Sequence, residues 1–221
     1  MKLGNSNARI SFYPLVRYRL PRSFYACDAL ELAPKLIGCY VVHRLSPIRI
    51  GRIVEVEAYR GPDDAACHAR VGLTKRTKTL LGEEGHAYIF RIYGMYDCLN
   101  VVCGSKGWGH AVLIRGVEPV LGFPEGKRTD GPGRVCNALG ITKDDDGCTL
   151  VGEALYLLPR TSSPVIQTSA RVGVAYAGAY AEQPWRFLDA SSPHVSRPPS
   201  RMIGLGNQTG ENRSNTNPFR L

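Results

Sequence analysis

Residues Ile53–Tyr59 read IVEVEAY, and their side chains alternate in kind with a period of two, as they do along a β-strand. The apolar side of this strand is made of Val54, Val56 and Ala58. On the other side, Glu55, Glu57 and Tyr59 are spaced about 7 Å apart. That side is either the solvated face of a sheet or the wall of a hydrolytic site, because an aromatic ring desolvates a neighbouring carboxylate that can activate water.

Similar strand-like segments, separated by turn residues, lie on both sides of this stretch. The 24 Gly and 15 Pro residues indicate many turns, which is typical of a sheet-rich or mixed fold. Helices are predicted at 28–37 and 132–139. Strands are predicted at 39–45, 50–59, 86–92, 96–103, 111–115, 154–158, 171–176 and 185–189. Few helices among many strands predict an α+β fold: a single domain with a curved, mainly antiparallel sheet, surrounding helices and a protruding β-hairpin.

The chain has 221 residues and a formal net charge of +9, from 28 Lys and Arg together against 19 Asp and Glu. Of the basic residues 21 are Arg, which reflects either nucleic-acid binding, since the guanidinium suits phosphate, or a GC-rich genome. The basic residues are clustered, and neither residues 1–27 nor Arg70–Lys78 contains an acid. This clustering favours a nucleic-acid partner, because counterion release needs several cations close together.

We expect three segments along the chain: a basic, flexible arm at 1–22, a folded domain at 23–203 and a disordered tail at 204–221. No apolar run is long enough to span a membrane, and the N-terminus lacks the apolar stretch of a signal peptide. Seven Cys are irregularly spaced, without a C-x-x-C motif. We therefore expect reduced thiols, no metal site and a cytoplasmic protein without a clear nuclear localisation run.

A tight turn is expected at Tyr93-Gly94-Met95, between the strands at 86–92 and 96–103. Large side chains are unusual there, because turn positions are exposed and favour polar residues. Either a neighbouring loop covers the tip, or the aromatic ring is a wedge that enters the minor groove of DNA and replaces a base in the stack.

Five blocks of the sequence resemble the alkyladenine (methylpurine) DNA glycosylase family, and they occur in the same order. The resemblance covers about Leu32–Ser196, nearly the whole expected domain. The first block contains the opening strand and the second contains the tight turn. The blocks are RIVEVEAYRGPDDAACH at 52–68, IYGMYDCLN at 92–100, VLIRGVEP at 112–119, GPGRVCNAL at 131–139 and ARVGV at 170–174.

The resemblance implies a single-domain α/β fold and a monofunctional glycosylase. Such an enzyme flips an alkylated or deaminated purine (3-methyladenine, 7-methylguanine, hypoxanthine or ethenoadenine) out of duplex DNA. It then hydrolyses the N-glycosidic bond and leaves an abasic site. The resemblance implies no cofactor and no membrane partner, and a monomer is expected because scanning one duplex requires no second copy.

The resemblance also implies the catalytic residues. Glu57 is the general base that deprotonates the attacking water, and Arg115 and the carbonyl of Val172 hold that water. The blocks contain no Lys. Since lyase activity requires an amine that forms a Schiff base, we expect none. Glu55 is interpreted as structural, bonded to neighbouring Arg or Tyr side chains.

In the implied base pocket, Tyr59 and His68 flank the flipped purine and Asn100 lies beneath it, where its bulk disfavours the 2-amino group of guanine. The family usually has a tyrosine three residues before the intercalating one, and this chain has Phe90 there. The stacking ring is kept and its hydroxyl is lost.

Other residues are implied to contact DNA outside the pocket. Tyr93, with Met95 at the same tip, is the side chain inserted into the minor groove. Gly131 and Arg134 lie at the start of the helix expected at 132–139, where backbone amides can bind a phosphate of the DNA backbone.

Two other classes of function remain open at this point. A non-catalytic nucleic-acid-binding module explains the charge and the aromatic residues, but it does not explain why Glu57 and Tyr59 share a face. A formyltransferase-like enzyme requires an Asn-His-Asp type of transfer site, and we locate none in the sequence. The first alternative predicts that Glu57→Gln leaves all activity intact.

Overall fold

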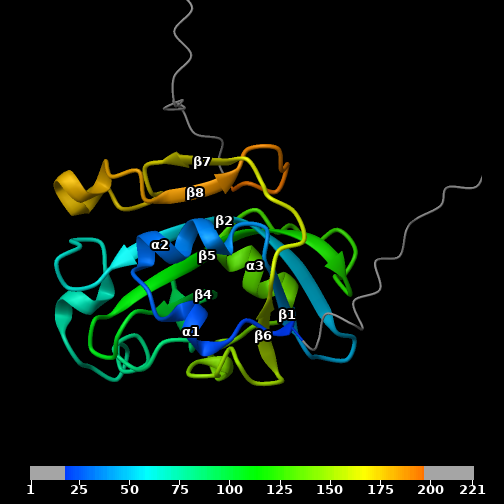
Figure 1. The fold of residues 1–221 in the computed structure, drawn as a ribbon, viewed down its shortest axis with the longest axis horizontal. Coiled ribbons are helices and arrows are strands. Elements are labelled where there is room, and N and C mark those ends of the chain that lie inside the picture. The colour runs from blue at the N-terminus through cyan, green and yellow to red at the C-terminus, as the bar shows by residue number, and fades with distance from the viewer. Residues whose placement is uncertain (1–17, 197–221) are drawn as a thin grey trace, which may run out of the picture.

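A curled antiparallel sheet dominates the computed structural model, which describes residues 18–196 (Figure 1). Its strands run in the order β3-β4-β5-β2-β1-β6, and β8 pairs with both β2 and β7. The predicted α+β fold with a mainly antiparallel, curved sheet is confirmed. The strands are β1 Tyr40–His43, β2 Arg49–Arg60, β3 Ala87–Ile92, β4 Tyr96–Cys103, β5 His110–Leu121, β6 Leu155–Leu158, β7 Ile166–Ser169 and β8 Arg186–Asp189.

The helices of the described residues are short. They are α1 Arg22–Tyr25, α2 Ala29–Leu36, α3 Pro132–Leu139 and the 3-10 helices η2 His68–Val71, η3 Lys143–Asp145 and η4 Ala175–Ala181. α2 begins where the side chain of Asp28 accepts a hydrogen bond from the N–H of Leu30, at 2.8 Å. α3 begins at a proline and ends at Gly140, whose φ of 71° lies in the left-handed region that glycine favours. Among residues 18–196, no helix is long and apolar enough to cross a membrane.

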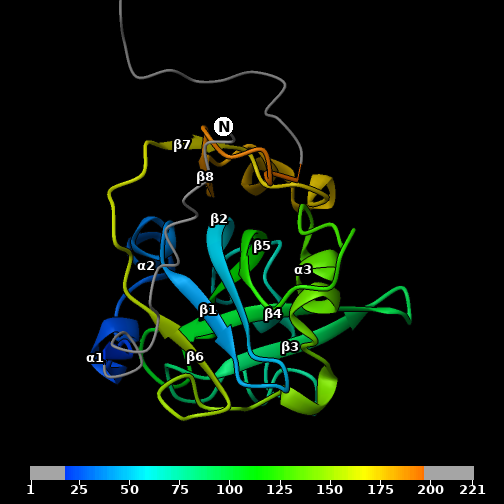
Figure 2. The same ribbon diagram turned by 90° about the vertical axis from the view of Figure 1, so that its right-hand side faces the viewer.

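α2 and α3 lie against the sheet (Figures 1 and 2). One hydrophobic core joins both helices to it. α2 contributes Leu32 and Leu36, and α3 contributes Val135 and Leu139, all with no exposed surface. Burying a leucine or valine side chain of this kind stabilises the fold by about 1.5–3 kcal/mol. The same core contains Val56 and Ala58 of β2, so Glu57 and Tyr59, which alternate with them, face the opposite side of the sheet.

β2 is the long central strand, and it is covered on both faces. It pairs with β5 along most of its length, and with β1 at its start and β8 near its end. Its register against β5 shifts at Val54: Ile53 pairs with Val117 and Glu55 with Gly116. This bulge at Val54 is matched on β5 by Arg115, which is also skipped, so the original register returns where Val56 pairs with Ile114. As a result Ile53 replaces Val54 beside Val56 and Ala58 in the main core.

Several predicted elements differ from the structure. The strand predicted at 111–115 is β5, which extends to Leu121. Residues 171–176 do not form the predicted strand: 171–174 form a loop, and 175–176 begin η4. Gly173 has a φ of 79°, and the side chain of Arg171 lies in a buried ion pair with Asp64. The strand β7 was not predicted from the sequence. It pairs with β8.

The ends of the chain extend beyond the described residues. Leu20 and Arg22, at the end of the expected arm, lie against the domain: the N–H of Leu20 donates to the carbonyl of Leu157 at 3.0 Å, and Arg22 donates to the carbonyl of Glu84 at 2.7 Å. Residues 1–17 of the arm, residues 197–203 of the expected domain and the expected tail at 204–221 lie outside the described part. All seven cysteines are unpaired, as expected.

Candidate active site

A cavity of about 230 Å³ lies between β2, β5, the β3–β4 hairpin and the loop after β7. Its lining includes seven residues that the sequence places in the site: Tyr59, His68, Phe90, Tyr93, Asn100, Arg115 and Val172. A larger hollow of about 670 Å³ lies elsewhere, beside Asp28, Arg60 and Trp108, and contains none of them. The smaller cavity is therefore the candidate site.

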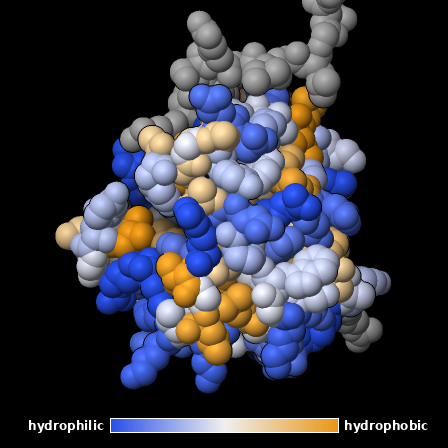
Figure 3. Space-filling view, turned by 90° about the vertical axis from the view of Figure 1, so that its left-hand side faces the viewer, coloured by the Kyte–Doolittle hydropathy of each residue, from blue (hydrophilic) through white to orange (hydrophobic). Residues whose placement is uncertain are grey.

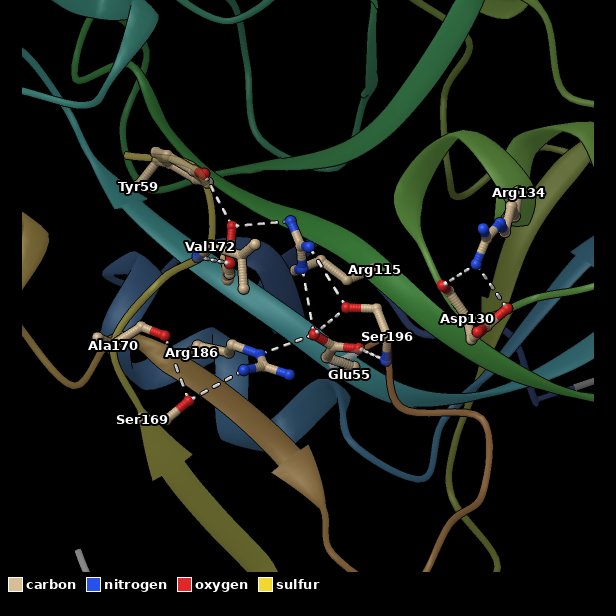
Figure 4. Close-up of polar contacts among 11 residues, drawn as sticks. Glu55, Tyr59, Arg115, Asp130, Arg134, Ser169, Ala170, Val172, Arg186 and Ser196 are labelled. Carbon is tan, nitrogen blue, oxygen red and sulfur yellow. Dashed lines mark hydrogen bonds and ion pairs between the residues drawn. The ribbon is translucent and has the colours of Figure 1, made fainter. Parts of the chain in front are cut away.

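Glu57 lies directly behind the wall of this cavity, with no exposed surface. Three groups of the described residues contact its carboxylate, and they belong to Tyr59, Arg115 and Val172, which line the cavity. Figure 4 labels these three residues. The Tyr59 hydroxyl donates to Oε2 at 2.8 Å, the Val172 N–H donates to Oε1 at 2.7 Å, and Arg115 Nη1 lies 3.4 Å from Oε2. Burial raises the pKa of Glu57 above its usual range, and these contacts partly offset the rise. A buried carboxylate with a raised pKa is a stronger general base.

Glu55 is also fully buried, but its carboxylate forms ion pairs with two arginines. Its Oε1 accepts from Nε of Arg115 at 3.1 Å and from Nε of Arg186 at 2.7 Å. The backbone N–H of Ser196 donates to its Oε2 at 2.6 Å, and the Ser196 hydroxyl donates to Oε1 at 2.8 Å. Glu55 is thus bonded to arginines, as expected, and holds Arg115 beside Glu57 (Figure 4).

His68 is a neutral part of an aromatic wall. Burial, assisted by the neighbouring Arg76, lowers the pKa of His68 to about 4. Arg76 Nη2, which can only donate, lies 3.3 Å from His68 Nε2, so Nδ1 carries the proton and faces the Tyr88 hydroxyl at 3.0 Å. The Phe90 ring packs edge-on against the imidazole, with 4.5 Å between the ring centroids. The aromatic wall of the cavity therefore carries no imidazolium charge.

Asn100 lines the same cavity and is 3% exposed. Its Nδ2 donates to the carbonyl of Tyr88 at 3.0 Å and to that of Cys98 at 3.3 Å. These two bonds fix the orientation of the amide in the cavity wall.

The β3–β4 turn brings a strained aromatic residue to the mouth of the cavity. Ile92 pairs with Tyr96, and the turn residues Tyr93 and Gly94 have φ values of 51° and 71°. A positive φ is costly for a residue other than glycine, so a bulky Tyr at this position points to a use for its side chain. Tyr93 is 85% exposed and lines the cavity, so no loop within residues 18–196 covers the tip.

Three of the expected DNA-contacting residues lie outside the cavity. Met95 and Arg134 line a separate groove of about 530 Å³, together with Lys127 and Arg128. Arg134 donates to the carboxylate and the carbonyl of Asp130, well apart from the Glu57 cluster (Figure 4). Gly131 precedes α3 as its N-cap residue, and the next residue, Pro132, lines the cavity.

The surface around η4 and the loop after β2 carries hydrophobic side chains among hydrophilic ones (Figure 3). Val71, Leu73 and Tyr176 are each more than 70% exposed. Arg70, Lys75, Arg76 and Lys78 lie in the same segment as Val71 and Leu73. A cluster of basic residues of this kind favours a nucleic-acid partner.

The model of the family described as methylpurine-DNA glycosylase matches residues 23–193 of the chain. The chain belongs to this family. It is therefore an enzyme of DNA repair, a DNA glycosylase that hydrolyses N-glycosyl bonds. The family that the sequence blocks resemble is confirmed.

Three bacterial relatives show the same membership. A protein of Myxococcus xanthus (strain DK1622) is 49% identical over 187 residues, which cover 82% of this chain and 96% of that one. A protein of Anaeromyxobacter dehalogenans (strain 2CP-1) is 46% identical, over 82% and 87% of the two chains, and one of Bacillus cereus (strain AH820) is 42% identical, over 80% and 98%. All three carry the name 3-methyladenine DNA glycosylase as a provisional assignment.

Several residues of this glycosylase site were missed in the sequence. Tyr88 shares a strand face with Phe90 in β3, so the alternation of that strand could have identified it. Asp64 and Arg171 stand inside the quoted blocks, but their pairing across 107 residues has no local signal. Arg186 and Ser196 lie outside the blocks. Among the described residues, no group of three His, Cys, Asp or Glu side chains could hold a metal ion.

Proposed function

We propose that this glycosylase removes alkylated or deaminated purines from duplex DNA, with Glu57 as the general base. The class includes 3-methyladenine, 7-methylguanine, hypoxanthine and ethenoadenine. The observation that supports it most directly is the buried Glu57 carboxylate behind the cavity wall, contacted by Tyr59, Arg115 and the N–H of Val172. A non-catalytic DNA-binding module has no use for a desolvated carboxylate with a raised pKa.

In the proposed reaction, a water oxygen bonds to C1′ of the flipped nucleotide while the C1′–N bond breaks. The electron pair of that bond goes to the purine: a cationic methylpurine leaves as a neutral base, and a neutral purine such as hypoxanthine leaves as an anion that takes up a proton from solvent. Glu57 accepts a proton from the attacking water. Arg115, which Glu55 holds in place, orients the water together with the Val172 carbonyl. Because Glu57 has no exposed surface in the free protein, DNA binding has to admit this water to its carboxylate.

The cavity suits a flipped purine in its chemistry. Tyr59, Phe90 and the neutral His68 provide ring surfaces, and stacking on electron-rich rings stabilises a cationic base. Asn100 provides an amide of fixed orientation in the wall. No lysine lines the cavity within the described residues, so we expect hydrolysis alone and no strand cleavage through a Schiff base.

Excision from defined duplexes tests this function. Oligonucleotide duplexes with one hypoxanthine, ethenoadenine or methylated adenine are incubated with the protein and then treated with alkali, which cleaves at abasic sites. We expect a strand break at the lesion only after alkali. A break without alkali would indicate lyase activity, and the absence of breaks in all three duplexes would overturn the proposed substrate class.

The Tyr93→Ala variant should bind lesion duplex about ten- to hundredfold more weakly. Nothing then fills the gap left by the extruded nucleotide, and stacking on an aromatic side chain is worth about 1–3 kcal/mol per base. Ethenoadenine fluorescence measures flipping and binding together. Tyr93→Phe, which keeps the ring, is the matched control and should bind normally, and both variants should bind undamaged duplex like the parent. A Tyr93→Ala protein that flips ethenoadenine as well as the parent would refute the proposed intercalation of Tyr93.

A further inference from the structure

Arg171 and Asp64 form a buried ion pair behind the base pocket. Neither side chain has any exposed surface. The pair is bidentate, with Arg171 Nη1 on Asp64 Oδ2 and Nη2 on Oδ1. The same guanidinium also donates to the carbonyl of Ala58, at 3.0 Å, and to that of Tyr180, at 3.1 Å. Burying two charges is costly even when they are paired, so such a pair is weak as a device for stability alone.

The Arg171 guanidinium lies between two aromatic rings. Its carbon is 4.8 Å from the ring centroid of Tyr59 and 4.9 Å from that of Trp185. Tyr59 lines the cavity and Arg171 does not, so the guanidinium supports the Tyr59 ring from the side away from the cavity. The planar fork of arginine can stack and bond bidentately at once, which lysine cannot do.

The residue after Arg171 is the one whose N–H contacts Glu57. Val172 lies in a loop, not in a strand, and Gly173 follows it with a φ of 79°. A sheet ladder therefore does not fix the position of the Val172 amide. The four hydrogen bonds of Arg171 fix it instead, to Asp64, to the end of β2 at Ala58 and to Tyr180 of η4.

We propose that the Asp64–Arg171 pair positions the groups around the catalytic base. It keeps the Val172 N–H hydrogen-bonded to Glu57. It also keeps the Tyr59 hydroxyl on Glu57 and the Tyr59 ring in the wall of the pocket. The proposal rests on the proposed role of Glu57 as general base. Arg171 and Asp64 touch no substrate and act only through Val172 and Tyr59.

The consequence is a shift in the pH dependence of excision. The titratable and charged groups around Glu57 are Glu55 and Tyr59 of β2, Arg115 of β5, Arg186 of β8 and Arg171 in the loop. The Val172 N–H and the Tyr59 hydroxyl stabilise the ionised carboxylate. If they move away, the pKa of Glu57 rises further, and the loss of activity on acidification begins at a higher pH.

The test uses the full-length protein and three variants: Arg171→Lys, Asp64→Asn and Val172→Pro. Val172→Pro removes the N–H that donates to Glu57, because proline has none; it also fixes φ at residue 172 and restricts the backbone of Arg171. The single-turnover excision rate of hypoxanthine at saturating enzyme is measured from pH 5 to pH 9, and binding to the lesion duplex is measured in parallel. Thermal melting establishes that each variant is folded at the assay temperature.

We expect each variant to lose about tenfold or more of the excision rate at neutral pH. We also expect the acidic limb of the pH–rate profile, where the rate falls as Glu57 is protonated, to move up by about one pH unit. A hydrogen bond to a charged group changes its pKa by about one unit or more. Lesion binding should change far less. The Arg171→Lys and Val172→Pro effects should not add in the double variant, since both act on the same N–H.

The matched control is Arg52→Lys. Arg52 forms ion pairs with Glu118 and Asp189, and it also stands on β2 but contacts no group at Glu57. This variant should lose stability without any shift of the acidic limb. If the Arg171 and Asp64 variants behave like Arg52→Lys, with lower stability and an unchanged acidic limb, the pair is structural and the proposal fails. If Arg171→Lys does not fold, Asp64→Asn and Val172→Pro decide the question. An acidic limb absent from the parent protein, or unaffected by Glu57→Gln, would instead refute the role of Glu57 itself.

Discussion

The Glu57→Gln variant should lose about 100-fold to 10,000-fold of its single-turnover excision rate, the range expected when a general base is removed. Glutamine keeps the volume of the side chain. Its one carbonyl oxygen can accept from the Val172 N–H, and its amide NH2 can donate to the Tyr59 hydroxyl, but the side chain cannot take a proton from water. The loss of its negative charge also removes electrostatic support from the positive charge that develops on the sugar in the transition state.

This variant should remain folded and should bind lesion duplex. Burial raises the pKa of Glu57, so the folded protein favours the uncharged form of this side chain relative to the unfolded chain, and a neutral glutamine does not cost stability on that account. The rate is measured at saturating enzyme on a hypoxanthine duplex, with binding followed in parallel. Glu153→Gln, the same change at an exposed carboxylate, is the control and should excise normally. Full activity in the Glu57 variant would place the base elsewhere.

The second large effect is on stability: Glu55→Gln should lower the free energy of unfolding by about 3–5 kcal/mol. Glu55 is the carboxylate on which Arg115 and Arg186 converge, and none of the three side chains is more than 9% exposed. Without its charge, two buried guanidinium groups lose their shared counterion, and Glu57 contacts Arg115 at only 3.4 Å. Removing one partner of a buried ion pair destabilises a protein far more than replacing both partners by apolar residues, because it leaves a buried charge unpaired.

Urea unfolding measures this prediction, because the midpoint and the slope together give the free energy. Glu153→Gln is again the control, and as a surface change it should remain within about 0.5 kcal/mol of the parent. A loss below about 1 kcal/mol in Glu55→Gln would show that water or a rearrangement compensates the arginines. Glu57→Gln is thus expected mainly to lower the excision rate, and Glu55→Gln mainly to lower the free energy of unfolding.

The regular elements with local signals were predictable from the sequence. The strand β4 and the helix α3 have the predicted bounds, because alternation and the Pro132 and Gly140 helix ends act within a few residues. The bulge at Val54 and the loop at 171–176 were not predictable in this way. Alternation of apolar residues in ARVGVAY resembles a strand, but the buried bonds of Arg171 to Asp64 outweigh that local preference.

The sequence by itself determined which chemical groups share one face of β2, because a strand places Glu55, Glu57 and Tyr59 on the same side whatever the rest of the chain does. It also determined the family, through blocks that keep their order. What only the tertiary structure decided is the different environment of the two glutamates. Val172, 115 residues beyond Glu57, brings it an N–H, whereas Arg186 and Ser196, 131 and 141 residues beyond Glu55, enclose that carboxylate with Arg115. The pKa and the accessibility of a carboxylate depend on such distant partners, because burial and hydrogen bonding are properties of the packed fold and not of the strand.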